Sequence, residues 1–128
     1  MSAFEISEVT TGAISTLRIH SVMYLERAEF YLSRKKYHIS KEFIELSDTC
    51  CEKIHGIVLD RLVENHRKVF NELMAMPAEM YEDCPTLGST ITHFAVDWGK
   101  GKGDFHEAIW ELEDEINICI EVLEEDSE

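Results

Sequence analysis

The chain has 128 residues, of which 45% are hydrophobic and 30% are charged, ordinary values for one globular domain with its own core. Its formal net charge of −14 argues against a broad contact with duplex DNA or an anionic membrane, because such contacts depend on many lysines and arginines. A small local basic site is still compatible with this charge.

The start of the chain, MSAFEISEVTTG, lacks the basic residues and the apolar run of a signal peptide. The sequence also lacks a run of about 18 apolar residues, the minimum for a membrane-spanning helix. We therefore expect a cytoplasmic protein without a membrane segment. Its cysteines do not form a spaced framework, so we expect four reduced thiols: Cys50, Cys51, Cys84 and Cys119.

The first half of the chain predicts a loosely ordered arm over residues 1–13 and then a helix over residues 13–36. This helix has one regular inward stripe, made of Ile14, Leu17, Ser21, Leu25, Ala28 and Leu32. The cations Arg34, Lys35 and Lys36 suit its C-terminus. After a short break, Ser40 is the expected N-cap of the second helix.

The second helical pattern covers residues 40–76 without a proline. Its stripe contains Phe43, Leu46, Cys50, Ile54, Ile57, Val58 and Leu62. Because helices average about 11–12 residues, we expect a break near Asn65 and His66. A turn-rich connection is predicted between Pro77 and Thr86.

The last part of the chain predicts a short helix that ends at the GKGKG stretch of residues 99–103, followed by an acidic helix capped by Asp104. Residues 104–128 hold eleven acidic residues and no lysine or arginine. One apolar stripe nevertheless runs through them: Phe105, Ile109, Leu112, Ile116, Cys119 and Leu123. Together these elements predict a single all-α domain, an up-and-down bundle of four to five helices.

The order of several short motifs resembles HEPN domains. The stretch LERAEFYL from Leu25, the basic break at Lys35 and Lys36, and the long helix with CCEK at residues 50–53 resemble the first helical hairpin of that family. The stretches NHR at residues 65–67 and THF at residues 92–94, before a final acidic helix, are similar to its archaeal PaREP1-type branch. The resemblance spans residues 15–124 and implies a HEPN-like fold.

The resemblance also implies a homodimer, a nucleotidyltransferase-type protein partner, and a toxin–antitoxin or defence context. Many HEPN proteins are ribonucleases with an Arg-x4-6-His motif. Arg61 and His66 match that spacing, but the family's motif lies near the last helices, where His93 has no arginine four to seven residues before it. Arg61, His66 and His93 are therefore the catalytic candidates of an alternative reading, an active or degenerate HEPN ribonuclease.

The geometry of a regular helix separates Arg61 from His66 by about 140°. An arginine that holds a phosphate and a histidine that moves a proton must face one substrate. Unless the helix breaks between them, the two residues cannot do so from one chain, and we expect exposed surface residues.

Metal binding is the third reading. Glu52 and His55 form one Glu-x-x-His motif, whereas a di-iron bundle needs two such motifs and further glutamates. Zinc would need Cys51 and His55 to meet Cys84, His93 or Cys119 in space, and paired close ligands are missing. We therefore expect no metal and no cofactor.

The GKGKG stretch lies before a helix N-terminus, where backbone amides and lysines can hold an anion. The ligand-binding candidates gather around it: His93, Trp98, Lys100 and Lys102. Met23, Tyr24, Tyr31 and Val58 fall beside the main stripes, which favours a homodimer. The sequence thus predicts a module that binds a nucleotide, RNA or a protein, rather than an enzyme.

Overall fold

The computed structural model describes residues 4–75 and 87–126. It contains four helices: α1 (Glu8–Ser33), α2 (Tyr37–Ala75), α3 (Leu87–Asp97) and α4 (Phe105–Asp126). These ranges contain no strand, so the all-α prediction is confirmed. The predicted connection between Pro77 and Thr86 lies outside the described residues. None of the four helices combines the length and the hydropathy that crossing a membrane requires.

The N-terminal arm differs from the loose segment that the sequence predicts. Phe4 and Ile6 are buried in the main core, and α1 begins at Glu8 with Ser7 as its N-cap. The side-chain amide of Asn117 on α4 holds both backbone groups of Phe4: its Oδ1 accepts from the Phe4 N–H at 2.8 Å and its Nδ2 donates to the Phe4 carbonyl at 3.1 Å. The alternation of Phe4 and Ile6 gives the arm an inward face that pins it to α4.

The turn between α1 and α2 is tighter than predicted. Lys35 adopts a left-handed backbone conformation with φ 62°, and its N–H donates to the Leu32 carbonyl at 3.0 Å. The Lys36 N–H donates to the Tyr31 carbonyl at 2.9 Å, which completes a Schellman motif. Ser40 is therefore not an N-cap. It is buried inside α2, and its hydroxyl donates to the Ala28 carbonyl at 2.8 Å.

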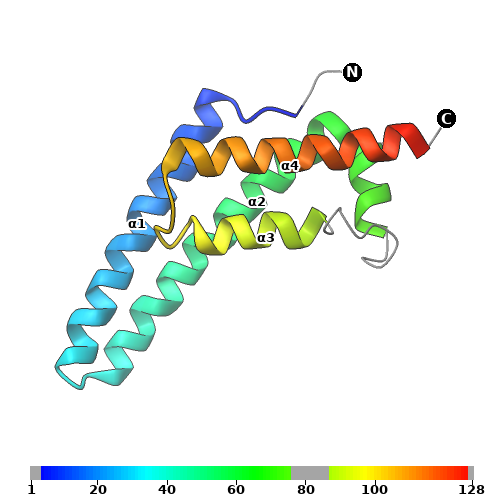
Figure 1. Ribbon diagram of the computed structural model, residues 1–128. Helices are drawn as coiled ribbons and strands as arrows, with labels where there is room; N and C mark the ends of the chain where they lie inside the picture. The colour runs from blue at the N-terminus through cyan, green and yellow to red at the C-terminus, as the bar shows by residue number, and fades with distance from the viewer. Residues whose placement is uncertain (1–3, 76–86, 127–128) are drawn as a thin grey trace.

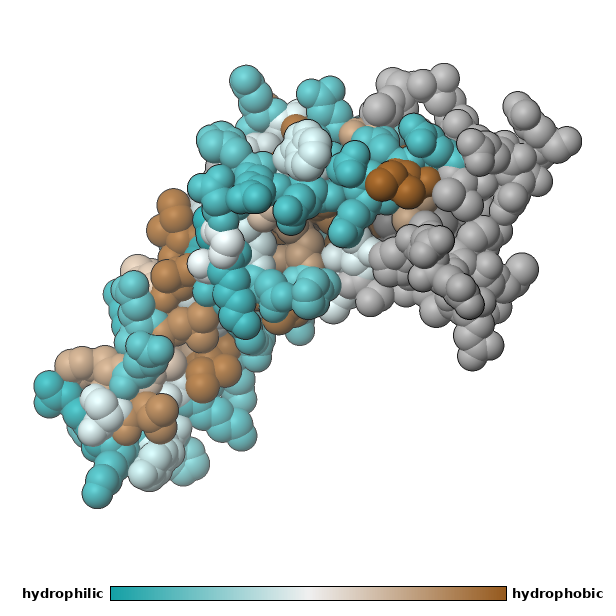
Figure 2. Space-filling model, in the orientation of Figure 1, coloured by the Kyte–Doolittle hydropathy of each residue, from teal (hydrophilic) through white to brown (hydrophobic). Residues whose placement is uncertain are grey.

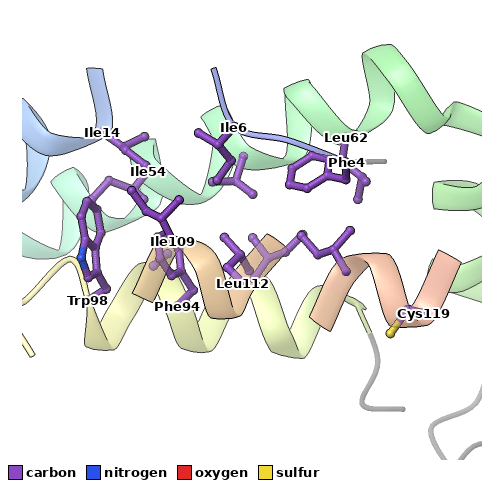
Figure 3. Close-up of a cluster of buried hydrophobic side chains, with 14 of the residues drawn as sticks. Phe4, Ile6, Ile14, Ile54, Leu62, Phe94, Trp98, Ile109, Leu112 and Cys119 are labelled. Atoms are coloured by element: carbon purple, nitrogen blue, oxygen red, sulfur yellow. The ribbon is translucent and has the colours of Figure 1, made fainter. Parts of the chain in front are cut away.

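A kink interrupts α2 at His66, where φ is −137° and ψ is 42°, at the place where the sequence predicts a break. The part of α2 before the kink carries three side chains that are fully buried: Ile54, Val58 and Leu62. They face α3 and α4, which run antiparallel to each other across this part of the hairpin (Figure 1). The core is completed by Ile91 and Phe94 of α3, by Trp98 just after α3, and by Ile109, Leu112 and Ile116 of α4 (Figure 3).

The far half of the α1–α2 hairpin extends beyond α3 and α4 (Figure 1). We call residues 22–46 the free half. Small side chains join its two helices: Ser21 and Ser47 form a hydrogen bond of 2.7 Å between their hydroxyls at its base, and Ala28 and Ser40 are buried along it. Tyr24 and Tyr31 of α1 also stack on Phe43 of α2, with ring centroids 6.2 and 5.6 Å apart. Other large apolar side chains of the free half, among them Leu32 and Ile44, are exposed, and Figure 2 shows brown atoms between the teal ones there.

Candidate functional site

His66 is buried, which corrects the expectation of an exposed residue. Its exposed fraction is 5%, and its ring packs against Phe4 with a centroid distance of 6.4 Å. Within the described part of the chain, neither ring nitrogen has a hydrogen-bond partner. His66 follows the buried Leu62 by four residues, so the helical spacing of α2 already places it on the inward face. A general base in this position is almost completely shielded from solvent.

Arg61 and His93 have separate acidic partners. Arg61 Nη1 lies 3.0 Å from Glu64 Oε2 on its own helix. His93 is exposed on α3, and its Nε2 lies 2.9 Å from Asp97 Oδ2. Each group is thus held by a carboxylate rather than directed at a shared phosphate. The structure does not bring the three catalytic candidates together.

The ligand-binding candidates are partly brought together. A cleft of about 390 Å³ lies between α3 and α4, and His93, Trp98 and Lys102 line it. Lys100 does not. Its ammonium group lies 3.1 Å from Asp48 Oδ1 on α2, so it ties the loop after α3 to the hairpin.

Trp98 serves the core rather than a ligand. Its exposed fraction is 2%, and its ring stacks on Phe94 with a centroid distance of 5.0 Å. The guanidinium of Arg18 lies over the ring at 4.8 Å and donates to the Trp98 and Gly103 carbonyls at 2.9 and 2.7 Å. Because Phe94 and Arg18 already contact this ring, Trp98 has no free face on which a nucleobase could stack.

The charge of the cleft opposes phosphate binding. Five carboxylates line it: Asp97, Asp104, Glu107, Glu111 and Glu115. The ligand-binding candidates His93 and Lys102 both face Asp97, at 2.9 and 3.9 Å. Asp104 also caps α4 as predicted, with its Oδ2 3.4 Å from the Glu107 N–H. A carboxylate thus occupies the position that a phosphate would take at this helix N-terminus. We call this site the acidic cleft.

The metal candidates Glu52 and His55 line a second hollow of about 370 Å³ between α2 and α3. His55 Nε2 is 3.2 Å from the Thr92 hydroxyl. Across residues 4–75 and 87–126, no three histidine, cysteine or acidic side chains are arranged to hold a metal ion. Of the zinc candidates, Cys51 and His55 both line this hollow, whereas His93 lines the acidic cleft.

The cysteines differ from one another. Cys50 and Cys51 are free thiols, as predicted, whereas Cys119 is disulfide-bonded, which corrects the prediction of a reduced thiol there; Cys84 lies outside the described residues. Burial raises the pKa of the Cys51 thiol, although a hydrogen bond with Ser21 partly opposes this effect. A buried thiol with a raised pKa is a weak nucleophile.

The feature that sequence reasoning missed is the surface of the free half. Leu32 and Leu46 belong to predicted core stripes, yet their exposed fractions are 52% and 44%. Helical periodicity shows which residues share a face, but the fact that α3 and α4 do not reach this face depends on the tertiary fold.

Comparison with known proteins adds no relative: no family model matches the chain, and no curated protein or solved structure matches it either.

Proposed function

We propose that this chain is a protein-binding module that pairs with a second copy of itself through the free half of its hairpin. The observation that carries the proposal is the position of its exposed apolar residues. Eleven large hydrophobic residues are exposed in the described part of the chain, and six of them lie on the free half: Phe30, Leu32, Tyr37, Ile39, Ile44 and Leu46. A concentration of this kind is typical of an interaction surface.

Two stripes of residues continue from the folded body onto the free half. Arg18, which binds the loop after α3, is followed at intervals of seven residues by Leu25 and Leu32. On α2, Cys51, which faces Gly99, is preceded at the same interval by Ile44 and Tyr37. Since seven residues make about two helical turns, these stripes lie on the side of the hairpin that α3 and its loop cover further along. We call Leu25, Leu32, Tyr37 and Ile44 the docking face.

The distribution of charge favours this face for pairing. Residues 22–46 contain five lysines and arginines and four acidic residues, so the free half is nearly neutral. The rest of the chain carries the excess of acidic residues, with eleven in residues 104–128 alone. Two molecules with a net charge of −14 therefore meet with the least repulsion at their free halves.

The other readings receive less support from the site geometry. A ribonuclease needs a histidine that reaches substrate, but His66 is buried and His93 faces Asp97. A nucleotide site needs cations and a free aromatic face, but the acidic cleft has five carboxylates and Trp98 is covered. Membership of the HEPN family and a nucleotidyltransferase-type partner stay predictions from the sequence.

The mass of the protein in solution tests the proposal. Sedimentation equilibrium is expected to give about twice the chain mass of 14.8 kDa for the wild-type protein. The double variant Leu32→Gln/Ile44→Gln is expected to shift the protein to monomer, because it makes the docking face polar without adding charge. The matched control Trp110→Gln/Ile118→Gln changes two exposed apolar residues of α4 and is expected to leave the dimer intact. A wild-type protein that stays monomeric up to about 100 μM, or two double variants with equal masses, would contradict the proposal.

A further inference from the structure

The docking face is too small to hold a stable dimer by itself. The α1 part of the free half, residues 22–33, is about 18 Å long at 1.5 Å per residue, and two helices side by side are about 20 Å wide. This footprint is less than half of the roughly 800 Å² that each partner buries in a standard interface. A stable pairing therefore needs a second contact outside the docking face.

The turn at the end of the hairpin supplies charges for such a contact. Arg34, Lys35 and Lys36 are consecutive and exposed, and among the described residues none of them has a carboxylate partner; Arg34 instead lies over the Phe30 ring at 4.2 Å. In a chain with 26 acidic and 12 basic residues, three adjacent cations without an acidic neighbour are unexpected. We call them the cationic turn.

The backbone of the cationic turn strengthens this point. Lys35 occupies the left-handed position of the Schellman motif, with φ 62°, where glycine is the usual residue because it has no Cβ. A lysine at this position strains the backbone. The turn keeps a positive charge in spite of this strain, which is typical of a residue with a binding role.

The acidic cleft has the complementary charge. Asp97 faces His93 and Lys102, but Asp104, Glu107, Glu111 and Glu115 of the cleft have no cationic partner in the part of the chain that the structure describes. The fold thus leaves unpaired cations at the end of the hairpin and unpaired carboxylates between α3 and α4. The distance along the hairpin prevents the two groups from meeting within one chain (Figure 1).

We propose that two copies pair in opposite directions along their docking faces, so that the cationic turn of each copy lies at the mouth of the other copy's acidic cleft. This inference rests on the proposed function, since it names the geometry and the second contact of the same pairing. The partner is a second copy because the chain itself carries both halves of the charge pair. A two-fold axis then makes the turn-to-cleft contact twice.

The position of the loop after α3 along the length of the hairpin supports this geometry. The free half starts at Val22, and a Cβ on Gly101 would lie 2.9 Å from the Val22 side chain. On the other helix, Lys100 contacts Asp48 at 3.1 Å. When two free halves overlap along their full length in opposite directions, the turn of one copy reaches the level of Val22 in the other. That level is where the loop leads into Gly103 and Asp104 of the acidic cleft.

Variants that reverse the charge of the cationic turn or of the acidic cleft test the pairing. The turn variant Arg34→Glu/Lys35→Glu/Lys36→Glu and the cleft variant Glu107→Lys/Glu111→Lys are each expected to weaken their own homodimer by at least about tenfold, because both contacts become repulsive. An equimolar mixture of the two variants is expected to restore a dimer with a Kd within about threefold of the wild-type value, since both contacts of the mixed dimer join opposite charges again. Sedimentation equilibrium gives the three dissociation constants, and circular dichroism shows whether each variant is folded.

Two control variants separate the contact from net charge. Lys53→Glu and Asp114→Lys change exposed residues outside the turn and the cleft, and they are expected to leave the Kd within about twofold of wild type. If the turn and cleft variants dimerise like wild type while Leu32→Gln/Ile44→Gln is monomeric, the docking face stands and the turn-to-cleft contact is refuted. A mixture that is no tighter than either variant alone also refutes the contact. A wild-type protein that is monomeric throughout overturns this inference and the proposed function together.

Discussion

Gly99 is the position at which the structure makes its sharpest prediction about stability. It follows Trp98 at the end of α3, with its N–H 3.1 Å from the Ala95 carbonyl oxygen. A Cβ at Gly99 would overlap with that oxygen and would lie 3.0 Å from Cys51 Sγ and 3.2 Å from Ile54 Cδ1 on α2. The oxygen belongs to the backbone of α3 itself and Ile54 is fully buried, so Gly99→Ala requires the last turn of α3 to rearrange and to shift away from α2.

The cost of this movement can be compared with that of a second glycine. Overpacking of a core costs about 1–3 kcal/mol, and a backbone obstacle places Gly99→Ala at about 2–3 kcal/mol. At roughly 4 °C per kcal/mol for a chain of this length, the Tm is expected to fall by about 8–12 °C. Gly56→Ala is the control, because Gly56 lies within α2 and a Cβ there meets no atom within 4 Å.

Thermal unfolding followed by circular dichroism, at one protein concentration for all variants, measures both effects. Alanine inside a helix is about 0.5–1 kcal/mol more favourable than glycine, so Gly56→Ala is expected to raise the Tm by about 2–4 °C. If Gly99→Ala melts within about 2 °C of the wild-type protein, Gly99 does not lie as close to the Ala95 carbonyl and to α2 as the structure shows.

Three further predictions concern single side chains. Asn117→Ala is expected to destabilise the protein by about 1–3 kcal/mol, because it leaves the Phe4 N–H and carbonyl without partners, whereas Asp114→Ala on the same helix should change the urea midpoint little; equal midpoints for the two variants would show that the arm is not held by Asn117. His66→Leu is expected to be neutral or stabilising by up to about 1 kcal/mol, since it removes a buried imidazole without hydrogen bonds; a loss above about 2 kcal/mol in urea unfolding would show that the ring has a partner. Burial raises the pKa of Cys51, so the stability from this neutral thiol is complete below the ordinary thiol pKa of about 8.5 and declines as the pH rises through the folded value. Urea titrations at about pH 7 and about pH 10 should show this decline in wild type and a smaller decline in Cys51→Ala; equal declines would refute it.

The predictable parts of the fold are the helices whose apolar period continues into a covered face. Ile109, Leu112, Ile116 and Cys119 follow this period on α4, and all four are buried. Helix ends were harder to predict. The cations Arg34, Lys35 and Lys36 indicated a C-terminus, but the left-handed residue after α1 is Lys35 rather than a glycine, so the sequence did not show which residue forms the turn.

The candidate site shows the same limit. His93, Trp98 and Lys102 line one cleft because they lie within ten residues of each other around a helix end, and this closeness was visible in the sequence. The acidic charge of the cleft was not visible in the sequence, since Glu107 and Glu111 enter the cleft from α4. Periodicity likewise placed Leu32 on a stripe but could not show that α3 and α4 leave the far end of this stripe uncovered.

The clamp between Phe4 and Asn117 also affects how the chain folds during synthesis. The two residues are 113 positions apart, so at about 5–20 residues per second a ribosome makes Asn117 roughly 6–23 s after Phe4. The α1–α2 hairpin has only contacts between neighbouring helices and can form within this interval, but Phe4 and Ile6 must wait for α4 before they can be buried. The nascent chain therefore carries two sets of uncovered apolar residues, those of the arm and those of the docking face, and only the first set is buried when α4 is added. The docking face is still exposed when the monomer has finished folding, and under the proposed pairing the concentration of completed chains determines when it is covered.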